Sequence, residues 1–233
     1  MKYLANILSC TSLFFGFLSI VFSLEQHFTF AAWAILISVV FDGLDGQAAR
    51  ISGGESEFGK ELDSLIDVIS FGIAPAVLGY IFVYREFHYL ATIGLFFYLL
   101  CSVMRLAKYN VTAKKEIGKY FIGLPTTMSG GALASFILIF RRSRYEIAAH
   151  PIPEIFLILI LIFSLLMISK VKYLNLDGFR DMLGKRSFIF ILALGLLLGL
   201  GLWFNKAGTI LFIVFLFYLI FSPFVVKKIN APR

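Results

Sequence analysis

Apolar runs long enough to cross a lipid bilayer dominate this sequence. A spanning helix needs about 20 mostly apolar residues, and the 233-residue chain is 60% hydrophobic with only 15% charged residues. Soluble domains carry roughly 25% charged residues, so this composition excludes a disordered chain and a typical soluble enzyme. The sequence predicts an all-α polytopic membrane protein with about eight transmembrane helices, at residues 7–24, 30–48, 61–84, 88–109, 123–140, 153–170, 188–204 and 208–226.

The distribution of basic residues predicts how these helices are oriented. With the N-terminus in the cytoplasm, sixteen of the 21 Lys and Arg residues fall on inside segments and five on outside segments, as the positive-inside rule requires. The cluster Arg141, Arg142 and Arg144 is the exception. Eight spans then place both termini on the cytoplasmic side of the cytoplasmic membrane or its equivalent. The net charge of +7 is explained by the basic residues on the cytoplasmic side, so no nucleic-acid partner is expected.

Acidic residues are scarce but strongly clustered. Seven of the 14 lie between residues 42 and 67. Asp42 and Asp45 are spaced i,i+3 and therefore share a helix face, and Asp63 and Asp67 share a face at i,i+4 on the next helix. The short polar connection at 51–57 can reverse the chain, so the sequence predicts that all four aspartates meet at the cytoplasmic edge of the membrane.

Four carboxylates beside lipid are costly unless a cation offsets their charge. Oxygen-only ligands suit Mg²⁺, Mn²⁺ or Ca²⁺, and four carboxylates suffice for two ions, which can clamp the attacking and leaving oxygens of a phosphoryl displacement. Gly46, Ala49 and Gly59 leave room for a nucleotide to approach the backbone, and Arg50 can hold a phosphate. Helix packing is the competing explanation for the two glycines.

The same residues match a known signature. The pattern D-x2-D-G-x2-A-R-x8-G-x3-D-x3-D resembles the motif of the CDP-alcohol phosphotransferase family. Its fixed positions are Asp42, Asp45, Gly46, Ala49, Arg50, Gly59, Asp63 and Asp67. The resemblance implies one membrane-embedded domain over 1–233, with a six-helix core and a C-terminal helix pair. Segments 61–76, 105–110 and 121–125 further resemble the phosphatidylserine synthase branch. The stretch 5–12 departs from the Pro-Asn-x2-Thr-x2-Asn pattern of many relatives and keeps only Asn6.

The resemblance also implies a reaction. The phosphatidyl group of CDP-diacylglycerol, or of an ether-lipid analogue, passes to the hydroxyl of L-serine, giving phosphatidylserine and CMP. Two divalent cations, Mg²⁺ or Mn²⁺ with Ca²⁺ as a non-productive substitute, are implied, together with a homodimer among membrane lipids. Asp42, Asp45, Asp63 and Asp67 are the expected metal ligands. Asp63 and Asp67 are expected to be catalytic, with Asp67 as general base, and Gly46, Ala49, Arg50 and Gly59 to bind the CDP moiety.

The acceptor site is less constrained. Arg105 is the first candidate for the serine carboxylate, because it lies near the end of a membrane helix on the side of the acids; Lys108 and Lys119 follow, and Ser64 and Ser70 can line the pocket. Anchoring on the positively charged inside face or contact with lipid headgroups is the competing explanation for the three cations, and a helical serine can bond its own backbone. Glycerol 3-phosphate, inositol phosphate or choline remain alternative acceptors. A metal-ion or proton-coupled transporter is a remote alternative, because transporters place such acids near the bilayer midplane.

Overall fold

A computed structural model describes residues 2–51, 56–112, 120–140, 151–175 and 206–229, together with Gly178 and Gly201. In this part of the chain, all regular structure is helical except for two short strands. The elements are α1 (Lys2–Leu24), α2 (Phe28–Ile51), α3 (Glu57–Asp67), the π-helical turn η1 (Val68–Ile73), α4 (Ala74–Thr112), β1 (Tyr120–Ile122), α5 (Thr126–Ile139), α7 (Ile152–Ile168), β2 (Lys172–Leu174) and α10 (Ala207–Ile229).

Within the described residues, five helical stretches are long and apolar enough to cross a membrane. They are Leu4–Leu24, Phe28–Arg50, Glu57–Val83, Phe87–Val111 and Ala207–Lys227, and α5 and α7 are shorter apolar helices. Seven of the eight predicted helices therefore have a counterpart. The predicted helix at 188–204 lies outside the described residues except for Gly201, so the total of eight stays a prediction.

The third and fourth predicted helices are nearly continuous. Helix α3 passes through η1 into α4, and the only break lies at Phe87, whose backbone leaves the helical region (φ −136°, ψ 50°). This break coincides with the predicted boundary between 61–84 and 88–109. Because α4 folds back there, its second half returns toward the end of the molecule at which α3 begins.

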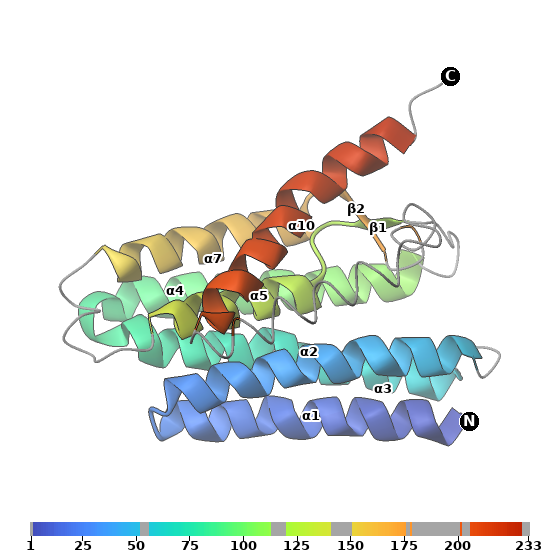
Figure 1. Ribbon diagram of the computed structural model, residues 1–233, viewed down its shortest axis with the longest axis horizontal. Coiled ribbons are helices and arrows are strands. Elements are labelled where there is room, and N and C mark those ends of the chain that lie inside the picture. Colours follow the sequence, from blue (N-terminus) through green and yellow to red (C-terminus); the bar gives the residue numbers. More distant parts are fainter. Residues whose placement is uncertain are drawn as a thin grey trace.

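The helices form a bundle with α5 near its centre. In Figure 1, α1 and α2 run side by side as an antiparallel pair, while α7 and α10 lie across α4 and α5 from them. Most of α5 is buried, including the run from Ser129 to Leu138. The N-terminus, the C-terminal end of α2, the start of α3 and the small sheet all lie at one end of the bundle (Figure 1).

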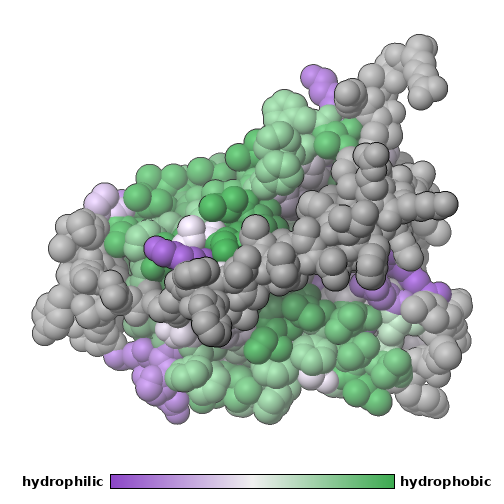
Figure 2. All heavy atoms as spheres, in the orientation of Figure 1, coloured by the Kyte–Doolittle hydropathy of each residue, from purple (hydrophilic) through white to green (hydrophobic). Residues whose placement is uncertain are grey.

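Apolar side chains cover much of the outside of this bundle. Phe14, Phe17 and Phe96 are each more than half exposed, at 55%, 57% and 64%. Figure 2 shows apolar residues along the lower part of the molecule, with hydrophilic residues toward its two ends. Exposed apolar surface of this extent is what lipid-facing helices present.

The two-stranded sheet determines where α5 begins. Strands β1 and β2 are antiparallel, with Phe121 opposite Tyr173. Gly123 follows β1 with a positive φ of 79°, and its N–H donates to the Val171 carbonyl at 2.7 Å. A Cβ at this position would collide with the Met167 carbonyl oxygen, so the tight turn needs glycine. Because Pro125 then disfavours helix at the residue before it, α5 starts at Thr126, three residues later than the predicted range.

Candidate metal and phosphate site

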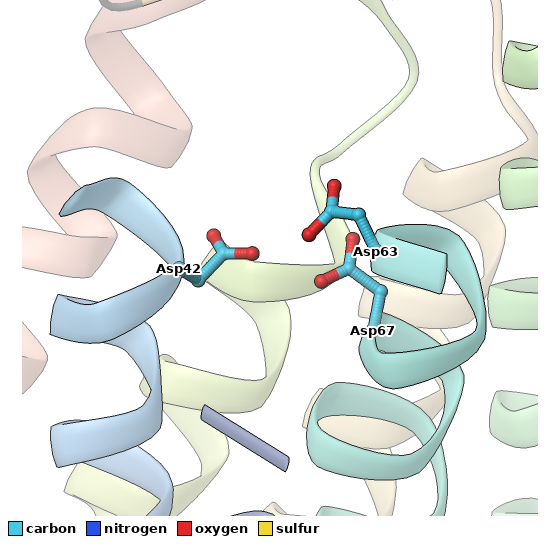
Figure 3. A group of neighbouring side chains, drawn as sticks. All are labelled: Asp42, Asp63 and Asp67. Atoms are coloured by element: carbon cyan, nitrogen blue, oxygen red, sulfur yellow. The ribbon is translucent and has the colours of Figure 1, made fainter. Parts of the chain in front are cut away.

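Three aspartate side chains converge at the end of the bundle where α2 ends and α3 begins. Asp42 comes from α2, and Asp63 and Asp67 come from α3, one turn apart. One carboxylate oxygen from each residue lies within 4.8 Å of the other two. Figure 3 shows the three carboxyl groups directed toward one another across the space between the two helices. The sequence predicted that the aspartates of these two helices converge, and the structure confirms this for Asp42, Asp63 and Asp67.

The local sequence explains how α3 presents its aspartates. Ser56 caps the helix, because its hydroxyl accepts from the Gly59 N–H at 3.0 Å, a preferred arrangement at a helix start. Gly59 also lies close to α1: a Cβ added there would be 3.2 Å from Asn6 Oδ1. Asn6, the residue that the N-terminal segment keeps from the family pattern, is thus beside the start of α3.

The donor set of this cluster fits a hard divalent cation. All its ligand atoms are carboxylate oxygens, which suit Mg²⁺, Mn²⁺ or Ca²⁺. Asp67 Oδ1 is buried and accepts no hydrogen bond from the described residues, which leaves a buried acceptor for a cation to satisfy. Like charges this close are unfavourable without a positive partner, so the cluster is a candidate metal centre.

Asp45, the fourth predicted ligand, is not part of this group of three. It lies three residues beyond Asp42 on α2 and is only 5% exposed. Because successive helical residues are rotated about the helix axis by roughly 100°, residues three apart point in directions that differ by about 60°, and the Asp42 direction is the one that faces α3. Its role as a metal ligand remains a prediction.

Two threonines at the start of α5 join the site, and the sequence reasoning did not identify them. The Thr127 hydroxyl donates to Asp42 Oδ2 at 3.3 Å. The adjacent Thr126 hydroxyl accepts from Arg105 Nη1 at 3.1 Å. The available signal was the pair of hydroxyls directly after Pro125, where a helix begins on the predicted cytoplasmic side. The first turn of α5 therefore connects α2 to the second half of α4.

Arg105 is buried beside the aspartates. It is 8% exposed and lies near enough to Asp67 and Asp42 to attract them electrostatically. Its guanidinium is also 6.0 Å from the centre of the Phe121 ring. The buried Nε donates no hydrogen bond to the described residues, so this N–H is available to an anionic ligand.

The residues predicted to bind the nucleotide surround the end of α2. A Cβ added at Gly46 would meet no atom within 4 Å, so helix packing does not account for this glycine among the described residues. Ala49 is 3% exposed, whereas Arg50 is exposed in the last turn of α2. The open backbone at Gly46, four residues beyond Asp42 on α2, leaves space for a ligand, and Arg50 is exposed one turn further along the same helix.

The predicted acceptor residues are in different surroundings. The Ser64 hydroxyl donates to the Lys60 carbonyl at 3.0 Å and lies 2.9 Å from Asn110 Nδ2. Ser70 is completely buried, and its hydroxyl donates to the Ser12 carbonyl of α1 at 3.4 Å. Lys108 is exposed on α4, and Lys119 lies outside the described residues. Of this group, Arg105 is the residue that the structure brings to the aspartates.

Comparisons with known proteins agree with the motif. Residues 2–175 match the CDP-alcohol phosphatidyltransferase family. The chain is 31% identical over 170 residues to the CDP-diacylglycerol–serine O-phosphatidyltransferase of Helicobacter pylori, which covers 73% of this chain and 71% of that protein. It is 36% identical over 177 residues to the archaetidylserine synthase of Methanothermobacter thermautotrophicus, covering 75% and 71%.

A third relative also comes from an archaeon and is named for transfer to serine. It is the CDP-diacylglycerol–serine O-phosphatidyltransferase of Methanocaldococcus jannaschii, 38% identical over 167 residues, or 71% of each chain. The family match, over residues 2–175, includes every aspartate of the cluster. The family match covers α1 through β2, that is, all the elements that build the site. This membrane protein therefore belongs to the CDP-alcohol phosphatidyltransferase family.

Proposed function

We propose that the protein transfers the phosphatidyl group of CDP-diacylglycerol to the hydroxyl of L-serine, forming phosphatidylserine and CMP. The observation that carries this proposal is the convergence of Asp42, Asp63 and Asp67 in a member of a phosphatidyltransferase family. The names of its relatives support serine, because both the phosphatidylserine and the archaetidylserine enzymes are named for that product headgroup.

The three carboxylates, with Asp45, are proposed to hold two divalent cations, Mg²⁺ or Mn²⁺. When bound, such ions would offset the negative charge of the diphosphate and stabilise the departing CMP. The open backbone at Gly46 admits the nucleotide, with Ala49 and Gly59 providing close approach. Arg50, exposed at the end of α2, is placed to hold a phosphate through its planar guanidinium.

The chemical step requires a base and an oriented nucleophile. Asp67 takes the proton from the serine hydroxyl while that oxygen bonds to the lipid-side phosphorus; the bond from phosphorus to the CMP oxygen breaks, and CMP leaves with its electron pair. Arg105 binds the serine carboxylate, because its buried Nε–H donates to no described residue. Lys108 and Lys119 are second candidates for this contact, and Ser64 and Ser70 for the pocket wall.

The location of the site follows from the proposed topology. Both termini and the aspartate cluster are proposed to face the cytoplasm, where CDP-linked lipid headgroups and free serine are accessible together. The lipid tails then lie against the apolar exterior of the helices while the diphosphate reaches the cluster at the helix ends. A homodimer, which the family resemblance implies, is retained as part of the proposal.

An acceptor-specificity assay tests the proposed function. Purified protein is given CDP-diacylglycerol, Mn²⁺ or Mg²⁺, and one acceptor at a time: serine, glycerol 3-phosphate, inositol phosphate or choline. We expect CMP release with serine and little with the others. Absence of CMP release with every acceptor would overturn the enzyme proposal. Release with a phosphorylated acceptor alone would overturn the serine assignment. A parallel series with an ether-linked CDP-lipid measures donor preference.

A further inference from the structure

The helix that carries Asp67 changes its hydrogen-bonding pattern directly after that residue. Residues Val68–Ile73 form a π-helical turn, which inserts an extra residue into an otherwise α-helical stretch. Such an insertion rotates everything before it relative to everything after it. The direction in which Asp67 points toward Asp42 therefore depends on this turn keeping its shape.

The turn contains a backbone carbonyl, that of Phe71, which cannot accept the usual α-helical hydrogen bond from the residue four positions later. The α-helical donor to the Phe71 carbonyl would be the N–H of the residue four positions later, which is Pro75. Proline has no N–H. Because Phe71 is completely buried, leaving its carbonyl without a donor would be costly.

Tyr98 donates a hydrogen bond to this carbonyl. It comes from the second half of α4, is completely buried, and donates its hydroxyl proton to the Phe71 carbonyl at 2.8 Å. The Tyr98 hydroxyl also lies 3.1 Å from Ser129 Oγ. The single Ser129 hydroxyl proton has two acceptors within reach, the Thr126 carbonyl at 2.8 Å and the Tyr98 hydroxyl oxygen at 3.1 Å.

The network ends at residues that contact the candidate site. Ser129 and Thr126 belong to the first turn of α5, which also carries Thr127. Thr126 accepts from Arg105, and Thr127 donates to Asp42. The α5 backbone lies against the same π-helical turn, because a Cβ at Gly130 would be 3.3 Å from Phe71 Cα. Tyr98 thus joins the turn that follows Asp67 to α5, the helix whose Thr127 bonds Asp42.

From this arrangement we infer that Tyr98 is a positioning residue for the metal centre. It makes no hydrogen bond to Asp67 in the described structure. It acts by holding η1 in its π-helical form against α5, so that the Asp67 carboxylate meets those of Asp42 and Asp63. The inference rests on the proposed function only in taking the aspartate cluster as a cation site.

The test is Mn²⁺ binding to the purified full-length protein in detergent, measured by electron paramagnetic resonance on metal-free samples, with CMP release measured in parallel. We expect Tyr98→Phe to weaken Mn²⁺ binding about 10-fold, the low end of the loss seen when a group that orients metal ligands is removed. The protein should remain folded with its melting temperature lowered by a few degrees. Ser129→Ala keeps the tyrosine ring in place and should weaken Mn²⁺ binding in the same direction by a smaller factor.

Tyr80→Phe is the matched control. Tyr80 also lies on α4, and its hydroxyl is 3.1 Å from His88 Nδ1. It is separated from Asp67 by 13 positions, about 20 Å along a helix, so its loss should leave Mn²⁺ affinity unchanged. If Tyr98→Phe and Ser129→Ala both bind Mn²⁺ as the wild type does, the positioning role is wrong while the metal site stands. If the wild-type protein binds no Mn²⁺, the metal site itself is wrong.

Discussion

At the scale of single residues, Asp63 offers the most direct test of the cluster. It lies on α3 one turn before Asp67, and one of its carboxylate oxygens is within 4.8 Å of ligand atoms from both other aspartates. Asp63→Asn keeps the shape and removes the charge. We expect CMP release to fall by more than about 100-fold, the scale seen when one preorganised electrostatic group is lost. Mn²⁺ affinity should fall with it.

The control for this substitution lies on the same helix. Glu57 is exposed in the first turn of α3, so Glu57→Gln makes the same chemical change away from the cluster. Its activity should stay within about 2-fold of wild type, since an exposed carboxylate at a helix start contributes only a few tenths of a kcal/mol. Near-normal turnover in Asp63→Asn would contradict the proposed metal centre.

Thr127 provides a second prediction at this scale. Its hydroxyl donates to Asp42 Oδ2 at 3.3 Å, and a hydrogen bond to a charged group contributes about 1.5–3 kcal/mol at good geometry. Because this bond is long, we expect Thr127→Val to lower kcat/KM for CDP-diacylglycerol by about 3- to 10-fold. Thr92→Val is the control: the Thr92 hydroxyl bonds the His88 carbonyl in an exposed part of α4, and its loss should change kcat/KM little. Equal rates in the two variants would remove Thr127 from the site.

At the scale of elements, the π-helical turn η1 is held between neighbouring helices at points where a glycine permits contact. On the α1 side, a Cβ at Gly16 would lie 2.5 Å from Ser70 Oγ and 2.9 Å from Ser70 Cα. Gly16→Ala must therefore move α1 away from η1. Overpacking of this kind costs about 1–3 kcal/mol, which corresponds to a melting temperature lower by roughly 3–10 °C for a chain of this size.

Gly94→Ala is the comparison for that substitution. A Cβ at Gly94 would make only an ordinary contact, 3.9 Å from Leu157 Cδ2, and alanine favours a helix by about 1 kcal/mol over glycine. Its melting temperature in detergent should therefore equal or exceed that of the wild type. A Gly16→Ala protein as stable as Gly94→Ala would show that α1 does not constrain the turn behind Asp67.

Contacts also integrate α10, which lies beyond the region matched by the family, into the bundle. A Cβ at Gly131 of α5 would lie 2.5 Å from the Phe215 ring of α10. The Tyr218 hydroxyl donates to the Leu174 carbonyl at 2.9 Å, and the Leu174 N–H donates to Ser222 Oγ. Strand β2 pairs with β1 directly before α5. Helix α10 therefore supports both the sheet and α5, the helix whose first two threonines bond Arg105 and Asp42.

At the scale of the whole molecule, the orientation in the membrane is open to direct measurement. The end of the bundle with the aspartates should face the cytoplasm, and the turn between α1 and α2 should face outward. Single cysteines at exposed positions, Glu57→Cys and Glu25→Cys, in a background lacking Cys10 and Cys101, distinguish the two faces. In intact cells, a membrane-impermeant maleimide should label Glu25→Cys only, and lysis should expose Glu57→Cys. The reverse labelling would invert the proposed topology.

Several features of this protein were determined by the sequence alone. Apolar length is a local property, so the helices at 7–24, 30–48, 61–84, 88–109 and 208–226 were predictable within a few residues. The pairing of Asp63 with Asp67 was predictable because it depends only on the pitch of one helix. Gly123 and Pro125 moved the start of α5 because a turn overrides apolar content.

Only the tertiary structure decided which residues meet at the site. It grouped Asp42, and not Asp45, with the α3 aspartates, because that choice depends on how far α2 is rotated about its axis. It brought Thr127 to Asp42 across 85 positions and Tyr98 to Phe71 across 27. Contacts between residues so distant in sequence depend on how whole helices pack, and the spacing of residues within a single helix carries no information about that packing.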